Sequence, residues 1–125
     1  MNEKIELLKK IDIENFVWII YILIIILSYY SNYVEKKYII YDDMIAREKY
    51  RNLIITIFSI ALLIYIYFFI EGLTDVLKLN IYDSESKKHF TNLSFIASTL
   101  ILIAGIIYLY IALNDKELEI ELAFS

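Results

Sequence analysis

The stretch LIITIFSIALLIYIYFFI, residues 53–70, contains no Asp, Glu, Lys, Arg or His. Residues 16–34 and 93–113 share this property, and the three stretches are 18 to 21 residues long. The hydrocarbon core of a bilayer is about 30 Å thick, so a helix rising about 1.5 Å per residue crosses it in roughly 20 residues. A helix of a soluble core usually keeps one polar face, whereas these stretches are apolar all round. The sequence therefore predicts an all-α membrane protein with three transmembrane helices.

Composition narrows the chemistry that such a chain can carry. The 125 residues include no Cys, no Pro, two Gly and one His, which excludes disulfides and thiolate metal sites. No phosphate-binding glycine loop occurs, and a net charge of −4 with scattered basic residues argues against nucleic acid binding. Little chain lies outside the apolar stretches and their connections. We therefore expect a single three-span membrane domain, residues 1–125, and no cofactor.

Polar residues between the apolar stretches predict the helix ends. The acidic pair at 42–43 interrupts an apolar stripe, and either residue can cap a second helix that begins near Met44. Gly72 is predicted to close that helix, because glycine tolerates the left-handed C-terminal conformation. Asp83 or Ser84 can cap a third helix. The expected transmembrane helices are about 16–34, 44–70 and 84–113, with a first loop at 35–52 and a second loop at 71–92.

The N-terminal segment, residues 1–15, precedes the first apolar stretch. It places Ile5, Leu8 and Ile11 among Glu and Lys at near-helical spacing, which predicts an amphipathic helix along the membrane surface. Lysines before an apolar stretch also occur in secretory signal peptides. The first stretch ends in Ser-Tyr-Tyr-Ser-Asn, residues 28–32, which offers no small-residue cleavage site. We therefore expect an uncleaved span.

In the acidic tail, residues 114–125, apolar residues recur at every second position and not at helical spacing. Alternation of apolar and polar residues is typical of a β-strand, and a lone strand needs a partner for its backbone groups. The tail is predicted either to be a solvated terminus or to form an extended strand that pairs with a partner. The apolar residues of this possible partner-binding tail are Leu118, Ile120, Leu122 and Phe124, and they alternate with Glu117, Glu119 and Glu121.

Small residues follow the third apolar stretch at helical spacing. Lipid supplies no hydrophobic drive for helices to associate, so close packing depends on small residues and on hydroxyl groups that bond across an interface. We interpret these residues as a helix-packing interface in preference to the lining of a pore, since Ile, Leu and Tyr dominate the C-terminal half of the stretch. The predicted interface comprises Ser94, Ala97, Ser98, Ala104, Gly105 and Ala112.

Residues Glu85 and His89 are weak candidates for metal ligands. They are four residues apart on an expected helix, with Asp83 nearby, and Asp75 or Glu71 would have to supply a further ligand. One His beside two lysines is more typical of an interfacial position. No catalytic residues are assigned, and the chain is expected not to be an enzyme.

The distribution of Lys and Arg leaves the orientation undecided. With three spans, the N-terminal segment and second loop share one side, and the first loop and acidic tail share the other. Each side carries six Lys and Arg residues. The positive-inside rule therefore gives a tie, which a chain inserting in both directions would also show.

These observations favour a small non-enzymatic membrane protein that acts through helix-helix association. Its expected partners are the lipid bilayer and either further copies of itself or another membrane protein. The role would be that of an accessory or regulatory subunit or a self-assembling component. The alternatives are an oligomeric channel or holin-like pore and, third, a metal-dependent membrane enzyme. Frequent Ile, Lys, Tyr and Asn are typical of an AT-rich coding genome. Such a genome suggests a bacterial origin, and the expected location is the bacterial plasma membrane.

Overall fold

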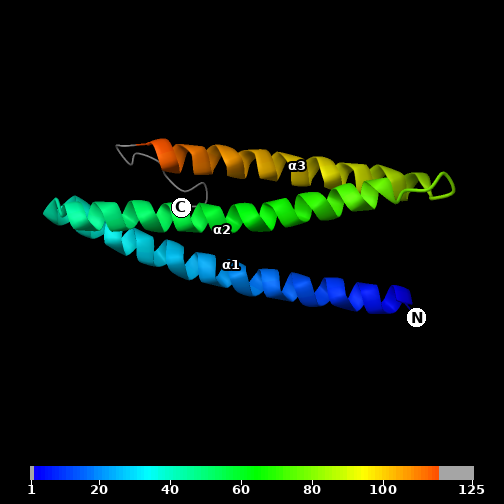
Figure 1. Cartoon of the computed structure of the whole chain (residues 1–125), viewed down its shortest axis with the longest axis horizontal. Helices are drawn as coiled ribbons and strands as arrows, with labels where there is room; N and C mark the ends of the chain where they lie inside the picture. The colour runs from blue at the N-terminus through cyan, green and yellow to red at the C-terminus, as the bar shows by residue number, and fades with distance from the viewer. Residues whose placement is uncertain (1, 116–125) are drawn as a thin grey trace. The chain divides into compact units, whose positions relative to one another are not determined.

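The computed structural model describes residues 2–115, and the regular structure in that range is entirely α-helical. The chain forms α1 (Asn2–Tyr41), α2 (Met44–Leu77) and α3 (Glu85–Asn114), as Figure 1 shows. At about 1.5 Å per residue the helices are about 60, 51 and 45 Å long. All three are long and apolar enough to cross a membrane, which confirms the predicted helical class. The predicted strand in the acidic tail lies outside the described residues.

Helix α1 is one uninterrupted helix of 40 residues. The N-terminal segment at 1–15 was predicted as a separate surface helix, but its described residues form the first turns of α1. The physical reason is local, because residues 2–15 contain neither Gly nor Pro, the two residues that disfavour a helix most. The helical conformation of this segment is confirmed, whereas the structure has no break before Phe16.

Two aspartates make the turn between α1 and α2. Asp42 has a φ of 50°, in the left-handed region, which ends α1 after Tyr41. Asp43 then caps α2, since its Oδ1 accepts hydrogen bonds from the backbone N–H groups of Ile45 at 3.0 Å and Ala46 at 3.3 Å. The predicted cap and the predicted start of the second helix near Met44 are confirmed.

The prediction that Gly72 closes the second helix is wrong. Helix α2 continues to Leu77, and Gly72 has no positive φ. Its backbone instead lies close to α3, because a Cβ added there would be 3.4 Å from Phe95 Cδ1 and 3.7 Å from Ser98 Oγ. These distances are ordinary van der Waals contacts, so Gly72 neither ends α2 nor is required by its packing against α3.

A short turn connects α2 to α3. The backbone N–H of Asp83 donates to the Asn80 carbonyl at 3.0 Å, and Ser84 is the N-cap of α3. The Ser84 hydroxyl accepts a hydrogen bond from the Lys87 N–H at 3.1 Å. The third helix therefore begins where the sequence predicted, at one of the two proposed caps.

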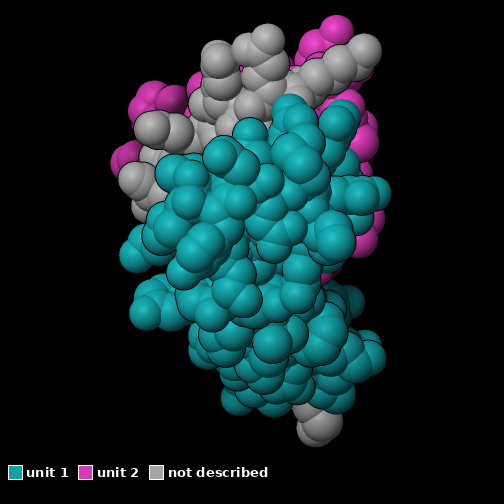
Figure 2. Space-filling model, turned by 90° about the vertical axis from the view of Figure 1, so that its left-hand side faces the viewer, with its two compact units in different colours: residues 1–57 teal, residues 58–125 magenta. Residues whose placement is uncertain are grey.

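The chain divides into two compact units, and the boundary falls inside α2. Unit 1 comprises residues 1–57 and unit 2 residues 58–125, as coloured in Figure 2. The buried residues of unit 1 include one polar side chain, Ser31, whose hydroxyl donates to the Ser28 carbonyl at 2.8 Å. The buried apolar residues of unit 1 are Val17, Ile24, Val34, Ala46, Tyr50, Ile54 and Ile57. Those of unit 2 are Phe58, Ala61, Ile64 and Ala112, together with Gly105.

Candidate functional site

The contact between α2 and α3 in unit 2, which we call the α2–α3 seam, follows a heptad pattern. Every third or fourth residue along α3 is buried or half-buried, the spacing of a coiled-coil face. At the centre of this row Gly105 is buried, and near its end Ala112 is 1% exposed. The row consists of Thr91, Phe95, Ser98, Leu102, Gly105, Leu109 and Ala112.

Gly105 lies directly against the ring of Tyr65. A Cβ added to Gly105 would be 2.7 Å from Tyr65 Cδ2 and 3.4 Å from Leu62 Cδ1. The first distance is too short for any side chain, so the glycine lets the backbone of α3 reach the tyrosine ring. Close backbone approach of this kind is how apolar helices gain dispersion contacts without a hydrophobic drive.

Aromatic pairs hold the seam on both sides of Gly105. The Phe58 and Tyr108 rings are parallel within 3°, with centroids 5.5 Å apart. Toward the other end the Phe69 and Phe95 rings are 5.4 Å apart at 36°. The aromatic residues of the seam were not predicted from the sequence. A signal was present for Phe58 and Tyr65, which are seven residues, or one heptad, apart on the same helix.

The residues of the predicted helix-packing interface lie in two neighbouring rows along α3. Ser98, Gly105 and Ala112 belong to the α2–α3 seam, and Ser98 donates from its hydroxyl to the Ser94 carbonyl at 3.0 Å. The other three predicted residues are exposed, although they follow the same helix one position away from the seam. We call this exposed row the small-residue stripe, and it consists of Ser94, Ala97 and Ala104.

In unit 1, tyrosines and cations join α1 to the first turns of α2. The Lys49 ammonium lies 5.0 Å from the centre of the Tyr30 ring, and the Arg47 guanidinium lies 5.8 Å from that of Tyr38. Within α1 itself, Lys37 lies 5.0 Å from the Tyr33 ring. We call these three pairs the tyrosine–cation belt. Tyrosine and lysine at the end of an apolar stretch are typical of the membrane–water interface.

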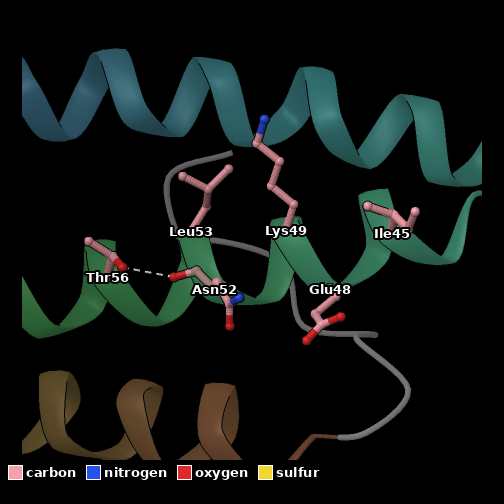
Figure 3. Close-up of a pocket in the computed structure, with 6 residues that line it drawn as sticks. All are labelled: Ile45, Glu48, Lys49, Asn52, Leu53 and Thr56. Carbon is pink, nitrogen blue, oxygen red and sulfur yellow. Dashed lines mark hydrogen bonds between the residues drawn. The ribbon is translucent and has the colours of Figure 1, made fainter.

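An open amphiphilic groove runs along the first turns of α2 beside this belt (Figure 3). Its volume is about 360 Å³. The Thr56 hydroxyl donates to the Asn52 carbonyl at 2.8 Å, whereas the Glu48 carboxylate and the Asn52 amide have no partner among residues 2–115. Two aliphatic side chains complete the lining, so the groove is amphiphilic. Its six residues are Ile45, Glu48, Lys49, Asn52, Leu53 and Thr56.

The weak metal candidates lie at the start of α3. Both are exposed; Glu85 pairs with Lys88 at 3.6 Å, and His89 contacts the edge of the neighbouring Phe90 ring. Within residues 2–115 no three His, Asp or Glu side chains come together as metal ligands. Glu85 and His89 are therefore not joined by the further ligand that the proposal required.

Asp83 is the titratable group with the clearest environment in this turn. Its pKa lies below the ordinary value of an aspartate, because its carboxylate accepts a hydrogen bond from the Asn80 backbone N–H at 2.8 Å and one from the Lys87 ammonium at 3.1 Å. The side chain is partly exposed, and its two hydrogen bonds order the turn before α3.

The tail predicted to bind a partner, which contains Leu118, Ile120, Leu122 and Phe124, lies outside the described residues. No protein-family model, curated protein or solved structure matches the chain.

Proposed function

We propose that this protein is a multi-pass integral membrane protein that acts without catalysis, through helix-helix association. The proposal is supported by three helices that are long and apolar enough to cross a membrane. Large apolar side chains remain exposed along all three, for example Ile25 at 66% and Leu63 at 69%. Such side chains suit contact with lipid tails, or with the helices of another membrane protein.

The small-residue stripe carries the proposal. Ser94, Ala97 and Ala104 are exposed, with Ile101 between the two alanines. An exposed alanine offers lipid little contact area, but it allows the backbone of a second helix to approach. The seam inside unit 2 uses Gly105 and Ala112 for the same purpose, so α3 carries two rows of small residues, and within residues 58–115 the row at Ser94, Ala97 and Ala104 is exposed.

The test compares the small-residue stripe with another exposed face of α3 by substitution in the full-length protein. Ala97→Leu and Ala104→Leu place bulk on the small-residue stripe, while Ile103→Leu changes another exposed face without changing volume. We expect the alanine variants, and not the Ile103 variant, to weaken self-association about tenfold in mild detergent, as loss of one close contact would. If the wild-type chain is a monodisperse monomer that copurifies with nothing from its native membrane, the proposal is wrong.

A channel or holin-like pore is the alternative, and the same oligomer would have to conduct. Conductance across planar bilayers that contain the purified protein would assign the chain to that class instead.

The proposed location is the plasma membrane of a bacterium. A pair of reporters active on opposite sides of the membrane, fused after Ser125, reads out the orientation; activity on both sides would establish dual insertion.

A further inference from the structure

We infer that the amphiphilic groove on α2 binds the headgroup of a phospholipid that carries a primary ammonium, such as phosphatidylethanolamine. The inference rests on the proposed membrane insertion, because it places the groove at the level of the lipid headgroups. The apolar stretch of α2 begins at Leu53, inside the groove, and the charged residues Glu48 and Lys49 lie on the preceding turn. The groove therefore spans the change from water to hydrocarbon.

The two sides of the groove carry opposite charges. Figure 3 shows Lys49 and Leu53 directed toward α1, while Glu48 and Asn52 leave α2 on another side. A ligand lying along Ile45 and Thr56 meets an ammonium on one edge and a carboxylate on the other. The formal charge of the lining residues is zero, which suits a zwitterionic headgroup. An anionic headgroup has no ammonium to pair with Glu48 and is repelled by its carboxylate.

The cationic edge is held in place for a phosphate. Lys49 lies over the Tyr30 ring at 5.0 Å, and this contact orients the ammonium while its N–H donors stay available. Lys37 and Arg47 lie over the Tyr33 and Tyr38 rings. Cations held among tyrosines at the end of an apolar stretch suit the phosphate level of a bilayer, where each adds electrostatic attraction.

The acidic edge selects the other end of the headgroup. The Glu48 carboxylate and the Asn52 side-chain oxygen are acceptors without a partner among residues 2–115. A primary ammonium has three N–H donors and can serve both acceptors, whereas the quaternary ammonium of a choline headgroup has none. The 360 Å³ of the groove is within the usual range of small-molecule sites, and Leu53 leads from it toward the acyl chains.

The test measures lipid retention by the full-length protein purified in detergent. Native mass spectrometry counts the lipids bound from an equimolar mixture of phosphatidylethanolamine, phosphatidylcholine and phosphatidylglycerol with identical acyl chains. We expect preferential retention of phosphatidylethanolamine. Glu48→Gln should lower that retention about tenfold, the effect of losing one charge-assisted hydrogen bond, while Glu14→Gln at an exposed site on α1 leaves it unchanged. Lys49→Gln should lower retention of all three lipids, because all three carry the phosphate.

Equal retention of the three lipids, preference for phosphatidylglycerol, or no effect of Glu48→Gln would overturn the inference. Resistance of the protein to extraction from membranes by alkaline carbonate separates this failure from failure of the proposed function. If the chain stays in the membrane and the lipids are not distinguished, only the headgroup site is wrong. If the chain is extracted, both proposals fail.

Discussion

The two helix contacts of this chain use different chemistry although they share α2. In unit 1 the first turns of α2 meet α1 through Lys49 over Tyr30 and Arg47 over Tyr38. In unit 2 the later turns of α2 meet α3 through a glycine against Tyr65 and through stacked rings. One contact lies where the chain is charged and the other where it carries no charge.

The membrane insertion proposed above accounts for the difference, because it places the residues before position 53 near water and the apolar residues after it in hydrocarbon. Near water, a cation over a tyrosine ring keeps part of its hydration and contributes about 0.5 to 1 kcal/mol. In hydrocarbon, a charge is costly and dispersion between closely packed atoms supplies most of the contact energy. The same helix can therefore form a polar contact in its first turns and an apolar contact in its later turns.

Bulk at Gly105 should break the α2–α3 seam. In Gly105→Leu the new side chain enters the space of the Tyr65 ring, so the free energy of unfolding should fall by about 2 kcal/mol, within the range for overpacked cores. Denaturation in mixed micelles, followed by circular dichroism, measures the change. The neighbouring Ala104→Leu is the matched control, because Ala104 is exposed and its substitution should leave the monomer intact. Equal losses in the free energy of unfolding in both variants would contradict the close contact between Gly105 and Tyr65.

Loss of the Asp43 cap should weaken the contact in unit 1. Asp43→Ala leaves the N–H groups of Ile45 and Ala46 without their acceptor, at a cost of about 1 kcal/mol. Faster amide hydrogen exchange in the first turn of α2 is the direct readout. Asp42→Gly is the comparison, since glycine relieves the left-handed φ of 50° and should slow exchange at the same turn.

The same substitution at the two glycines should have opposite signs. Gly72→Ala meets only ordinary contacts of 3.4 Å or more and gains helix propensity, so stability should rise by about 0.5 to 1 kcal/mol. Gly105→Ala places its Cβ 2.7 Å from Tyr65 Cδ2 and should lower stability instead. Melting temperatures of the two variants under one detergent condition provide the comparison. A rise in both would mean that Tyr65 yields easily.

Removal of one ring from the tyrosine–cation belt should have a smaller effect. Tyr30→Leu removes the contact with Lys49 and should lower stability by about 0.5 kcal/mol. A double-mutant cycle with Lys49→Met isolates the coupling energy of the pair. Tyr29→Leu, at a position that is 82% exposed, controls for the general loss of an interfacial tyrosine. A coupling energy of zero would leave the belt without energetic support.

The smallest effect should come from Asp83 at the start of α3. Its pKa is lower in the folded chain than in the unfolded chain, so the stabilisation is present above the unfolded pKa of about 4 and disappears as the pH falls through the folded value. The Asn80 amide donates to this carboxylate, and its protection factor, the intrinsic exchange rate divided by the observed one, should fall at the acidic end of that range. Asp83→Asn should abolish the pH dependence. The carboxyl chemical shift in an NMR titration reports the pKa directly.

Much of the fold was predictable because its determinants are local. Helix α3 begins after Ser84 and α2 after Asp43, as the capping residues indicated. The role of Gly72 was not predictable, since the conformation of a glycine depends on what lies beside it. The division of the small residues of α3 was not predictable either. Positions 104 and 105 differ by about 100° around a helix, and only the position of Tyr65 decides which of them is buried.

The three long apolar helices follow from the order of residues alone, because charge and hydrophobicity act residue by residue along each helix. Tertiary structure alone decided which residues of those helices meet. Contacts such as Gly105 with Tyr65, or Lys49 with Tyr30, join positions 40 and 19 residues apart in the chain. Periodicity specifies that a helix has faces, but which face is covered depends on the neighbouring helix.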